Sequence, residues 1–409
     1  MIGTPDGTFG TVHYDIHRKR RAAVSPLFSK GACAASESYI YKNVDLFLDC
    51  IDHQVRTTGF AELRRNFLAL TTDVLCDHCF GRSTGMLADP QAAEEWQSTI
   101  KTTAGLTPLV KQLPWIMPLS LKFPLWILQV VAPDMARIIK KRRDIDQQAK
   151  EAIAVKEEVG DGLMRTRYKQ SNDSRLDIFE TILSNPSLPP AEKEFARVGQ
   201  EGFVVLAAGG ETTARALTAA TYHILANREA VLPRLMEELY QVMPEETTQA
   251  SLKELESLPW LGAIVKETLR VLALITSRLP VTSPNQELVY KEWAIPAGTP
   301  IGLSIRDLLL DPDVFEEPTR FKPERWLTSG PELQRMMHNY VPFSRGSRMC
   351  LGMNLSIAEL HIVLASLFRR REMTLHDTIW ERDMKHVRDC FVGEPSLQSQ
   401  GMRIKYTKV

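Results

Sequence analysis

The sequence predicts a mainly α-helical protein with a small β portion, and three observations support that class. Residues 190–226 place apolar side chains around most of the circumference of one long predicted helix, with Pro190 near its first turn. A second helix is predicted over 257–273, and a third follows Cys350. Residues 287–305 instead combine β-branched and aromatic residues around a Pro-Ala-Gly turn, which favours a β-hairpin.

The whole chain, 1–409, is predicted to form a single domain. Hydrophobic residues make up 44% of its 409 positions, which is ample for a large core, and no Gly/Ser linker, low-complexity tract or internal repeat divides it. Fifty basic residues balance fifty acidic ones, so the chain lacks the global positive field that binding to nucleic acid requires. Its six cysteines are too few for a disulfide framework, which favours a reducing compartment.

The most apolar region, residues 106–133, contains five prolines and two lysines. Prolines inside a helix break it, so this region is not expected to be one membrane-spanning helix. It is predicted to form short helices that expose Trp115 and Trp126 to something apolar. Three settings stay open for these side chains: a lid over a substrate, a membrane interface, or the protein core.

The long helix contains the stretch AAGGETTA at residues 207–214, and its two adjacent glycines each cost about 1 kcal/mol relative to alanine in a helix interior. One explanation is tight packing of this helix on another, with a threonine hydroxyl bonded to the preceding turn. The other is a local distortion that opens a groove beside Glu211 and Thr212, a carboxylate and a hydroxyl suited to relaying protons.

Glu267 and Arg270 lie three residues apart in the helix predicted over 257–273 and are expected to share one face. Their apolar neighbours indicate burial, where an isolated ion pair carries a large desolvation cost. A third partner is therefore expected, and Arg325 in the stretch FKPERW is the candidate. The three are predicted to form a structural triad and not a catalytic group.

Cys350 is flanked by glycines and arginines and directly precedes a predicted helix. Free N–H groups and the positive end of the helix dipole stabilise a thiolate at such a position, which makes it a candidate nucleophile or metal ligand. A cysteine nucleophile needs a histidine base, and no motif marks one out among the nine histidines. A single thiolate ligand to haem iron instead needs backbone donors around the sulfur, glycines that admit a porphyrin, and arginine for its propionates.

Four segments together resemble one family. Phe343, Gly346, Arg348, Cys350 and Gly352 resemble the F-x-x-G-x-R-x-C-x-G signature of cytochrome P-450 haem-thiolate monooxygenases, in a sequence style similar to fungal microsomal members. Residues 208–213 resemble the oxygen-activating helix of that family, Glu267 with Arg270 its E-x-x-R pair, and residues 323–326 its P-E-R-F segment. The resemblance implies the cytochrome P-450 fold, and this chain is expected to lack the N-terminal anchor and first strands that family members carry.

The resemblance also implies a role for each matching position. Cys350 is expected to be the axial thiolate ligand of the iron in haem b, while Thr212 and Glu211 pass protons to the oxygen. Four side chains are expected to bind the haem propionates: His17, Arg21, Arg278 and Arg348. Three further positions are expected to contact the cofactor: Gly209, Phe343 and Gly352.

The implied activity is insertion of one oxygen atom from O2 into an apolar small molecule, in fungal secondary metabolism of the terpenoid or polyketide kind. Electrons are expected from NADPH through a cytochrome P-450 reductase, docked in part by Arg18, Lys19 and Arg20. The implied location is the cytoplasmic face of the endoplasmic reticulum membrane, with residues 106–133 as the substrate access lid. Two alternatives stay open: a haem-thiolate isomerase or peroxide-driven enzyme, and a truncated, catalytically impaired haem-binding remnant.

Overall fold

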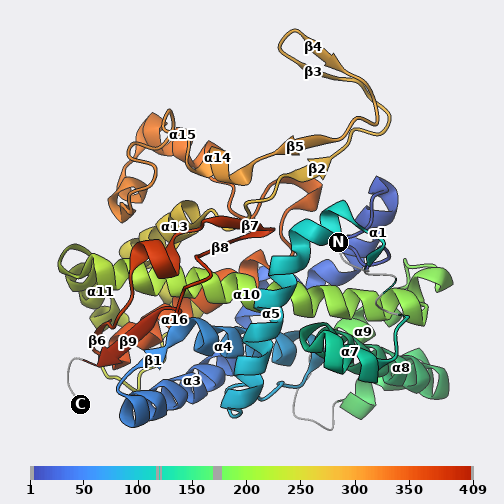
Figure 1. The fold of residues 1–409 in the computed structure, drawn as a ribbon, viewed down its shortest axis with the longest axis horizontal. Coiled ribbons are helices and arrows are strands. Elements are labelled where there is room, and N and C mark those ends of the chain that lie inside the picture. Colours follow the sequence, from blue (N-terminus) through green and yellow to red (C-terminus); the bar gives the residue numbers. More distant parts are fainter. Residues whose placement is uncertain (1–3, 117–118, 120–121, 169–176, 407–409) are drawn as a thin grey trace.

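The computed structural model describes residues 4–116, 119, 122–168 and 177–406, and it is mainly helical, as predicted (Figure 1). The helices, in chain order, are α1 (Tyr14–Val24), α2 (Lys30–Ala34), α3 (Glu37–Thr58), α4 (Leu63–Phe80), α5 (Pro90–Gln112), α7 (Leu125–Val131), α8 (Pro133–Tyr168), α9 (Ile178–Leu183), α10 (Phe195–Ala226), α11 (Arg228–Val242), α12 (Leu252–Glu256), α13 (Pro259–Leu272), α14 (Ile305–Leu309), α15 (Gly330–Asn339) and α16 (Met353–Arg370).

The strands are short and pair in antiparallel fashion. In chain order they are β1 (Ala61–Glu62), β2 (Leu279–Val281), β3 (Leu288–Tyr290), β4 (Trp293–Ile295), β5 (Ile301–Leu303), β6 (Met373–Leu375), β7 (Arg388–Cys390), β8 (Val392–Glu394) and β9 (Arg403–Tyr406). The strand β9 lies between β1 and β6 in a three-stranded sheet, and the other strands form the pairs β2–β5, β3–β4 and β7–β8.

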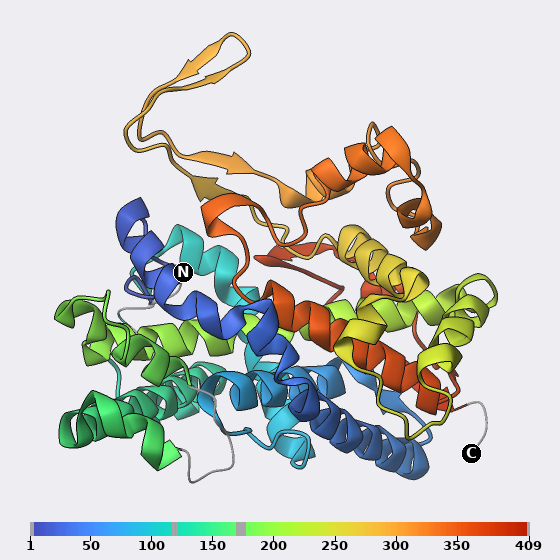
Figure 2. The same cartoon turned by 180° about the vertical axis from the view of Figure 1, so that it is seen from behind.

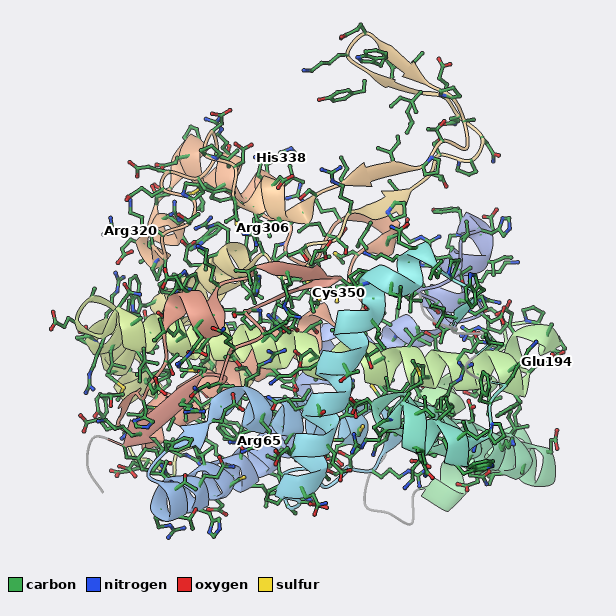
Figure 3. All side chains as sticks on the ribbon, in the orientation of Figure 1. Arg65, Glu194, Arg306, Arg320, His338 and Cys350 are labelled. Carbon is green, nitrogen blue, oxygen red and sulfur yellow. The ribbon has the colours of Figure 1, made fainter. Side chains whose placement is uncertain are left out.

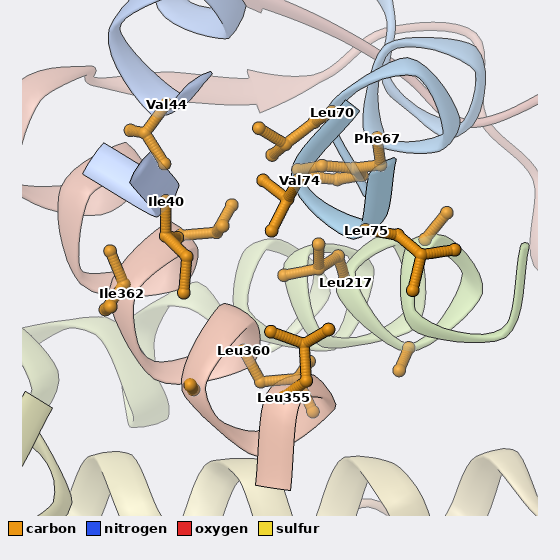
Figure 4. Close-up of a cluster of buried hydrophobic side chains, with 14 of the residues drawn as sticks. Ile40, Val44, Phe67, Leu70, Val74, Leu75, Leu217, Leu355, Leu360 and Ile362 are labelled. Atoms are coloured by element: carbon orange, nitrogen blue, oxygen red, sulfur yellow. The ribbon is translucent and has the colours of Figure 1, made fainter. Parts of the chain in front are cut away.

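The helix α10 crosses the middle of the molecule and packs against α4, α8, α13 and α16 (Figure 1). In Figure 4, Leu217 of α10 lies between Val74 of α4 and Leu360 of α16, and all three side chains are buried. The helix α16 lies in turn next to α3 and α13 (Figure 2). Burial of apolar surface on opposite sides of α10 is what makes this helix the centre of the core, as its sequence predicts.

The other predicted elements have nearly the expected bounds, but the long helix starts later than expected. It begins at Phe195, while Pro190–Lys193 form a separate 3-10 turn. Between them Glu194 is extended, with φ −66° and ψ 149°, so the chain changes direction there. The sequence analysis assigned the 3-10 turn and α10 to one helix, because a proline suits the first turn of either kind of helix.

The hairpin β3–β4 stands away from the body of the molecule (Figures 1 and 2). Its side chains are accordingly open to solvent, with Val289 76% and Trp293 65% exposed. Within the described residues β2 and β5 pair only with each other, so the outer edges of this small sheet carry unpaired backbone groups.

The proline-rich region is helical for longer than expected, because α5 continues through Pro108 to Gln112. Beyond it, Trp115 is 57% and Trp126 69% exposed, which excludes the core as their setting. Part of this region, residues 117–118 and 120–121, lies outside the described residues. Among the residues that are described, no helix has both the length and the apolar character needed to cross a membrane.

The buried imidazole of His223 makes a pH-dependent contribution to stability. His223 of α10 stacks on Phe321, which lies in the loop before Pro323, with ring centroids 4.6 Å apart. Burial lowers the pKa of His223 to about 4 from an ordinary 6.5. Between pH 6.5 and 4 the unfolded chain therefore binds a proton that the folded chain does not, so stability falls as the pH falls through this window. At pH 5 the loss is about 2 kcal/mol.

We predict that His223→Phe reduces the drop in unfolding free energy between pH 7 and pH 5 by about 2 kcal/mol, because phenylalanine keeps the stacking and cannot be protonated. Denaturant titrations at both pH values measure it. The matched control is His53→Phe at an exposed position of α3. Equal pH dependence in the parent and in His223→Phe would contradict the prediction.

Candidate functional site

Cys350 lies on the loop that leads into α16 and is exposed (Figure 3). Its N–H donates to the carbonyl of Phe343 at 2.9 Å, which closes the loop on itself. Gly346 turns the chain with φ +76°, a conformation that glycine adopts at little cost. Apart from its chain neighbours, no described residue comes within 4 Å of the place a Cβ would take on Gly346 or on Gly352, so there is open space on the loop beside the cysteine.

The structure corrects the expectation that the helix start by itself makes Cys350 a thiolate. The helix begins at Met353, three residues beyond the cysteine, and the effect of a helix dipole fades within the first turn. Desolvation by the surrounding protein raises the pKa of the Cys350 thiol, against smaller opposing effects of the Gly352 N–H and Arg21. Coordination to a metal cation would deprotonate the thiol.

Two arginines that are far apart in the sequence meet beside this loop. The Arg21 guanidinium of α1 donates to the carbonyl of Met349 at 2.6 Å, directly before the cysteine. Arg348 donates to the carbonyls of Thr11 and Val12 at 2.6 and 3.0 Å. The loop is thus held to the N-terminal part of the chain by two positive charges.

His17, one turn before Arg21 in α1, lies between these charges. Its side chain is 2% exposed, and its Nδ1 has no hydrogen-bond partner in the described part of the chain. Burial, followed by repulsion from Arg348 and Arg21, lowers the pKa of His17 to about 4. A buried nitrogen without a partner next to two guanidinium groups is the donor set of a site for an anionic group.

The fourth expected propionate ligand is placed differently. Arg278 precedes β2, is exposed, and makes no hydrogen bond or ion pair with the described residues. Its Cβ faces Gly302 of the neighbouring strand β5. The structure therefore groups His17, Arg21 and Arg348 and does not bring Arg278 into contact with them.

The two glycines of α10 face α4. A Cβ on Gly209 would lie 2.6 Å from a methyl carbon of Leu75, and one on Gly210 would lie 2.5 Å from the hydroxyl of Thr72. The helix is continuous across both positions. Close packing against α4 therefore explains why both positions are glycine, while the cofactor contact expected for Gly209 stays a prediction.

Thr212 lies on the more open side of α10. Its hydroxyl donates to the carbonyl of Ala208 at 3.0 Å, the bond to the preceding turn that was one of the two explanations for this stretch. Ala207 and Ala208 are exposed although most of α10 is buried. The hydroxyl therefore sits on a face of α10 that the described residues leave partly uncovered.

Glu211 is buried and paired with arginines. It is 7% exposed, and its Oε1 lies 2.6 Å from Arg64 of α4 and 3.6 Å from Arg215, one turn further along α10. Glu394 at the end of β8 contacts the same two arginines at 3.0 and 2.5 Å. Sequence analysis missed Arg64 and Glu394 because pairs 147 and 330 positions apart share no local motif, whereas the i, i+4 spacing of Glu211 and Arg215 was visible in the sequence.

The expected triad is assembled in a fully buried position. Arg270 donates to both carboxylate oxygens of Glu267 at 2.9 and 2.8 Å, and Arg325 donates to the same carboxylate at 3.1 Å. Two donors that the sequence did not suggest complete its shell: the Trp326 indole and the Lys322 N–H, each at 2.9 Å. The remaining Arg270 N–H groups donate to three backbone carbonyls, those of Leu309, Pro318 and Arg320.

Sequence analysis also missed a buried carboxyl group in α16. Glu359 is 3% exposed, and burial raises its pKa well above the ordinary value despite a hydrogen bond with Thr213. The Thr213 hydroxyl also donates to Ser356 at 3.1 Å. These side chains connect α10 to the helix that follows Cys350.

We predict that Arg270→Ala abolishes soluble protein or lowers the unfolding free energy by about 3–5 kcal/mol, because the Glu267 charge would stay buried without its main partner. The control is Arg320→Ala in the loop that Arg270 contacts, whose exposed ion pair with Glu317 should contribute little to stability. Soluble yield and denaturant unfolding measure both. A folded Arg270→Ala variant of parental stability would contradict the structural role.

Comparison with protein families matches residues 6–397 to the description Cytochrome P-450. A cytochrome P-450 monooxygenase of Ascocoryne sarcoides is 35% identical over 405 residues, which are 99% of this chain and 78% of the relative. A tryptophan 6-hydroxylase of Fusarium equiseti is 33% identical over 99% of this chain and 76% of its own length. An N-acetyltryptophan 6-hydroxylase of Emericella nidulans is 31% identical over the whole chain and 78% of its own length.

Among solved structures, the haem domain of a cytochrome P-450 matches with a TM-score of 0.72 at 18% identity. The match covers 98% of this chain and 79% of that domain. It supports the fold, while the relatives above support the family.

Proposed function

The chain belongs to the cytochrome P-450 family as one of its monooxygenases, and we propose that it oxidises a small molecule of fungal secondary metabolism with haem b bound through Cys350. The family match over residues 6–397 is the finding that places the chain among these enzymes. The proposed haem site and the roles of single residues rest on the geometry around Cys350.

The residues around Cys350 fit a haem. The Nδ1 of His17, which has no partner among the described residues, and the guanidinium groups of Arg21 and Arg348 are suited to carboxylates such as propionates. The open space at Gly346 and Gly352 leaves room for a flat ring against the loop. Two further residues are proposed to contact the haem. Phe343 also holds the loop, because its carbonyl accepts the Cys350 N–H. Arg278 is exposed and lies apart from the other propionate donors.

Bound haem supplies the electronic chemistry that activates O2. The contribution of this chain is to hold the iron through the sulfur of Cys350 and to bring protons to the oxygen. Thr212 is proposed to hold a water at its hydroxyl oxygen, which can accept a hydrogen bond from the water while it donates its own proton to the Ala208 carbonyl. Glu211 is proposed as the carboxylate that passes protons toward this face of α10.

The substrate is proposed to be a small molecule of the terpenoid or polyketide kind, as the resemblance to fungal monooxygenases of secondary metabolism implies. Two relatives are named as hydroxylases of tryptophan and of N-acetyltryptophan, so indole derivatives are further candidates. Substrate-induced shifts of the haem absorption band distinguish the three classes directly.

The proposed electron source is NADPH through a cytochrome P-450 reductase that docks on α1. Arg18 and Lys19 are exposed there, but Arg20 is not available, because it pairs with Glu192 at 2.7 Å in a largely buried position. The proposed location is the endoplasmic reticulum membrane. The exposed Trp115 and Trp126 are suited to its interface.

The two alternatives make different demands on the site. An isomerase or a peroxide-driven enzyme does not need the acid and alcohol pair of Glu211 and Thr212, which this chain carries. An impaired remnant that binds haem poorly would fail the first of the following tests.

We predict that the reduced, carbon monoxide-bound protein has the Soret band of a thiolate-ligated haem. Cys350→Ser should lose that band because serine offers no thiolate. The control is Cys50→Ser, a partly buried cysteine hydrogen-bonded to Asn66, which should keep it. A histidine-type spectrum in the parent, or an unchanged one in Cys350→Ser, would overturn the haem assignment.

We predict that Thr212→Ala uncouples NADPH oxidation from product formation, with reduced oxygen released as hydrogen peroxide, because the hydroxyl that holds the water is lost. Haem binding and the first reduction should stay at the parental level. Product, peroxide and NADPH consumption are measured together. The matched control is Thr218→Ala, whose hydroxyl makes the same kind of bond, to Ala214 at 2.7 Å, in a buried part of α10. Equal product per NADPH in Thr212→Ala and the parent would show a packing role only.

A further inference from the structure

Three polar side chains from three separate segments meet at the C-terminal end of α5. Lys111, in the last turn of α5, donates from its ammonium group to the Ser277 hydroxyl at 2.5 Å. The Ser277 hydroxyl donates in turn to Oδ1 of Asp389 in β7 at 2.8 Å. The helix α5 and the strand β7 are in contact (Figure 1). One hydroxyl therefore holds a positive and a negative group on either side of it.

Both charged groups keep unused hydrogen-bonding capacity. An ammonium group has three N–H donors, and that of Lys111 gives one to Ser277 and none to any other described residue. Oδ1 of Asp389 accepts from the hydroxyls of Ser277 and Thr276, each at 2.8 Å, and from the N–H of the Phe391 backbone at 3.0 Å. All three bonds end on Oδ1, so Oδ2 stays open within the described part of the chain. Lys111 and Asp389 are exposed, which makes the open donors and Oδ2 accessible to a ligand.

The carboxylate of Asp389 is kept ionised and in a fixed orientation. Burial raises its pKa, but the hydrogen bonds from Thr276 and Ser277 outweigh that effect and lower the pKa of Asp389 below its ordinary value. Ser277 is 4% exposed, so the packing around it holds its hydroxyl in place. A negative oxygen is therefore presented next to an ammonium group without rearrangement, which lowers the cost of binding a ligand of matching charges.

Two phenylalanine rings lie next to this charged pair. Phe391 follows Asp389 by two residues and meets Phe9 edge-on, with ring centroids 6.4 Å apart. Phe9 is 46% exposed and Phe391 is half-buried, so the two rings offer an accessible aromatic surface. Phe391 also has φ +77°, which is unfavourable for a bulky side chain, and backbone strain of this kind is concentrated at ligand sites.

The aromatic pair adjoins the face of α10 that carries Thr212. Gly7, two residues before Phe9, packs on α10, where a Cβ would lie 2.9 Å from a methyl carbon of Val204. Val204, Ala208 and Thr212 follow one another at intervals of four residues and so share one side of the helix. Ala208 is exposed, so the segment with Phe9 covers this side at one end and leaves the part next to Thr212 open.

We propose that Lys111 and Asp389 recognise the head group of a free aromatic α-amino acid as the substrate. The substrate carboxylate binds the Lys111 ammonium, its own ammonium binds Oδ2 of Asp389, and its ring rests on the two phenylalanines. The inference rests on the proposed function and narrows its substrate class. An α-amino acid carries both charges on one carbon, which matches two opposite charges held on either side of one hydroxyl. An uncharged terpenoid or polyketide would cover both groups without pairing them, which is unfavourable.

The test combines changes in the ligand with changes in the protein. The probes are L-tryptophan, L-tryptophan amide, which lacks the carboxylate, and N-acetyl-L-tryptophan, which lacks the ammonium. Each modified probe should bind the parent protein at least about tenfold more weakly than L-tryptophan, because one charged side chain is covered without a partner. Calorimetric titration measures the dissociation constants independently of any oxidation.

The variants should remove one preference each. Lys111→Gln should weaken binding of L-tryptophan and of N-acetyl-L-tryptophan about tenfold and leave the amide unchanged, because only the carboxylate loses its partner. Asp389→Asn should weaken L-tryptophan and the amide and leave N-acetyl-L-tryptophan unchanged. The matched controls are Lys42→Gln and Asp49→Asn at exposed positions of α3, which should bind all three probes as the parent does.

A network that only ties α5 to β7 predicts a different pattern. Its loss would change the binding of all three probes equally, and that result overturns the recognition role. A parent protein that does not bind L-tryptophan overturns it as well. Because Lys111 is exposed at a helix end, its variant tests the proposal even if Asp389→Asn does not fold.

The inference and the proposed function can fail separately. If the parent lacks the Soret band of a thiolate-ligated haem but binds the probes with this selectivity, the recognition site stands and the proposed function is wrong. If the band is present and the selectivity is absent, the proposed function stands and the assignment of Lys111 and Asp389 is wrong.

Discussion

The fully buried ion pair of Glu267 and Arg270 is the interaction on which the rest of the structure depends. A guanidinium group without solvent must give all its N–H groups to acceptors, and here three of those acceptors are backbone carbonyls between residues 309 and 320. The segment after α14 therefore has to wrap around α13. Trp326, bonded to Glu267, packs edge-on against Tyr340 with ring centroids 4.9 Å apart, so the same anchor positions the chain that leads into the Cys350 loop.

Two kinds of contact then set the two sides of the candidate site. On one side, α16 follows Cys350 and is joined to α10 by apolar packing and by the Glu359, Thr213 and Ser356 contacts. On the other side, α10 is pressed against α4, because Gly209 and Gly210 have no side chains to keep the helices apart. The faces of α10 are thus divided, with its glycines toward α4 and Thr212 on a more open side.

The charged side chains of the site form two separate clusters that differ in net charge. The cluster of His17, Arg21 and Arg348 carries excess positive charge and a nitrogen that no described residue binds, so it suits an external anion. The cluster of Glu211 and Glu394 with Arg64 and Arg215 is balanced within itself, so it joins α4, α10 and β8 without leaving a buried net charge.

Local sequence determined the helices α10, α13 and α16, the hairpin β3–β4, the pairing of Glu267 with Arg270, and the loop around Cys350, because each depends on residues within a few turns of one another. Only the tertiary structure decided where Glu211 points, since its partners Arg64 and Glu394 lie 147 positions before it and 183 after it. The glycines of α10 illustrate the same division. Their unfavourable helix propensity is visible in the sequence. Only the tertiary structure shows that Leu75 and Thr72 of α4 pack against them and leave no room for a side chain. Spacing along the chain specifies what neighbouring residues can do together, whereas burial and long-range pairing decide which charge each of them meets.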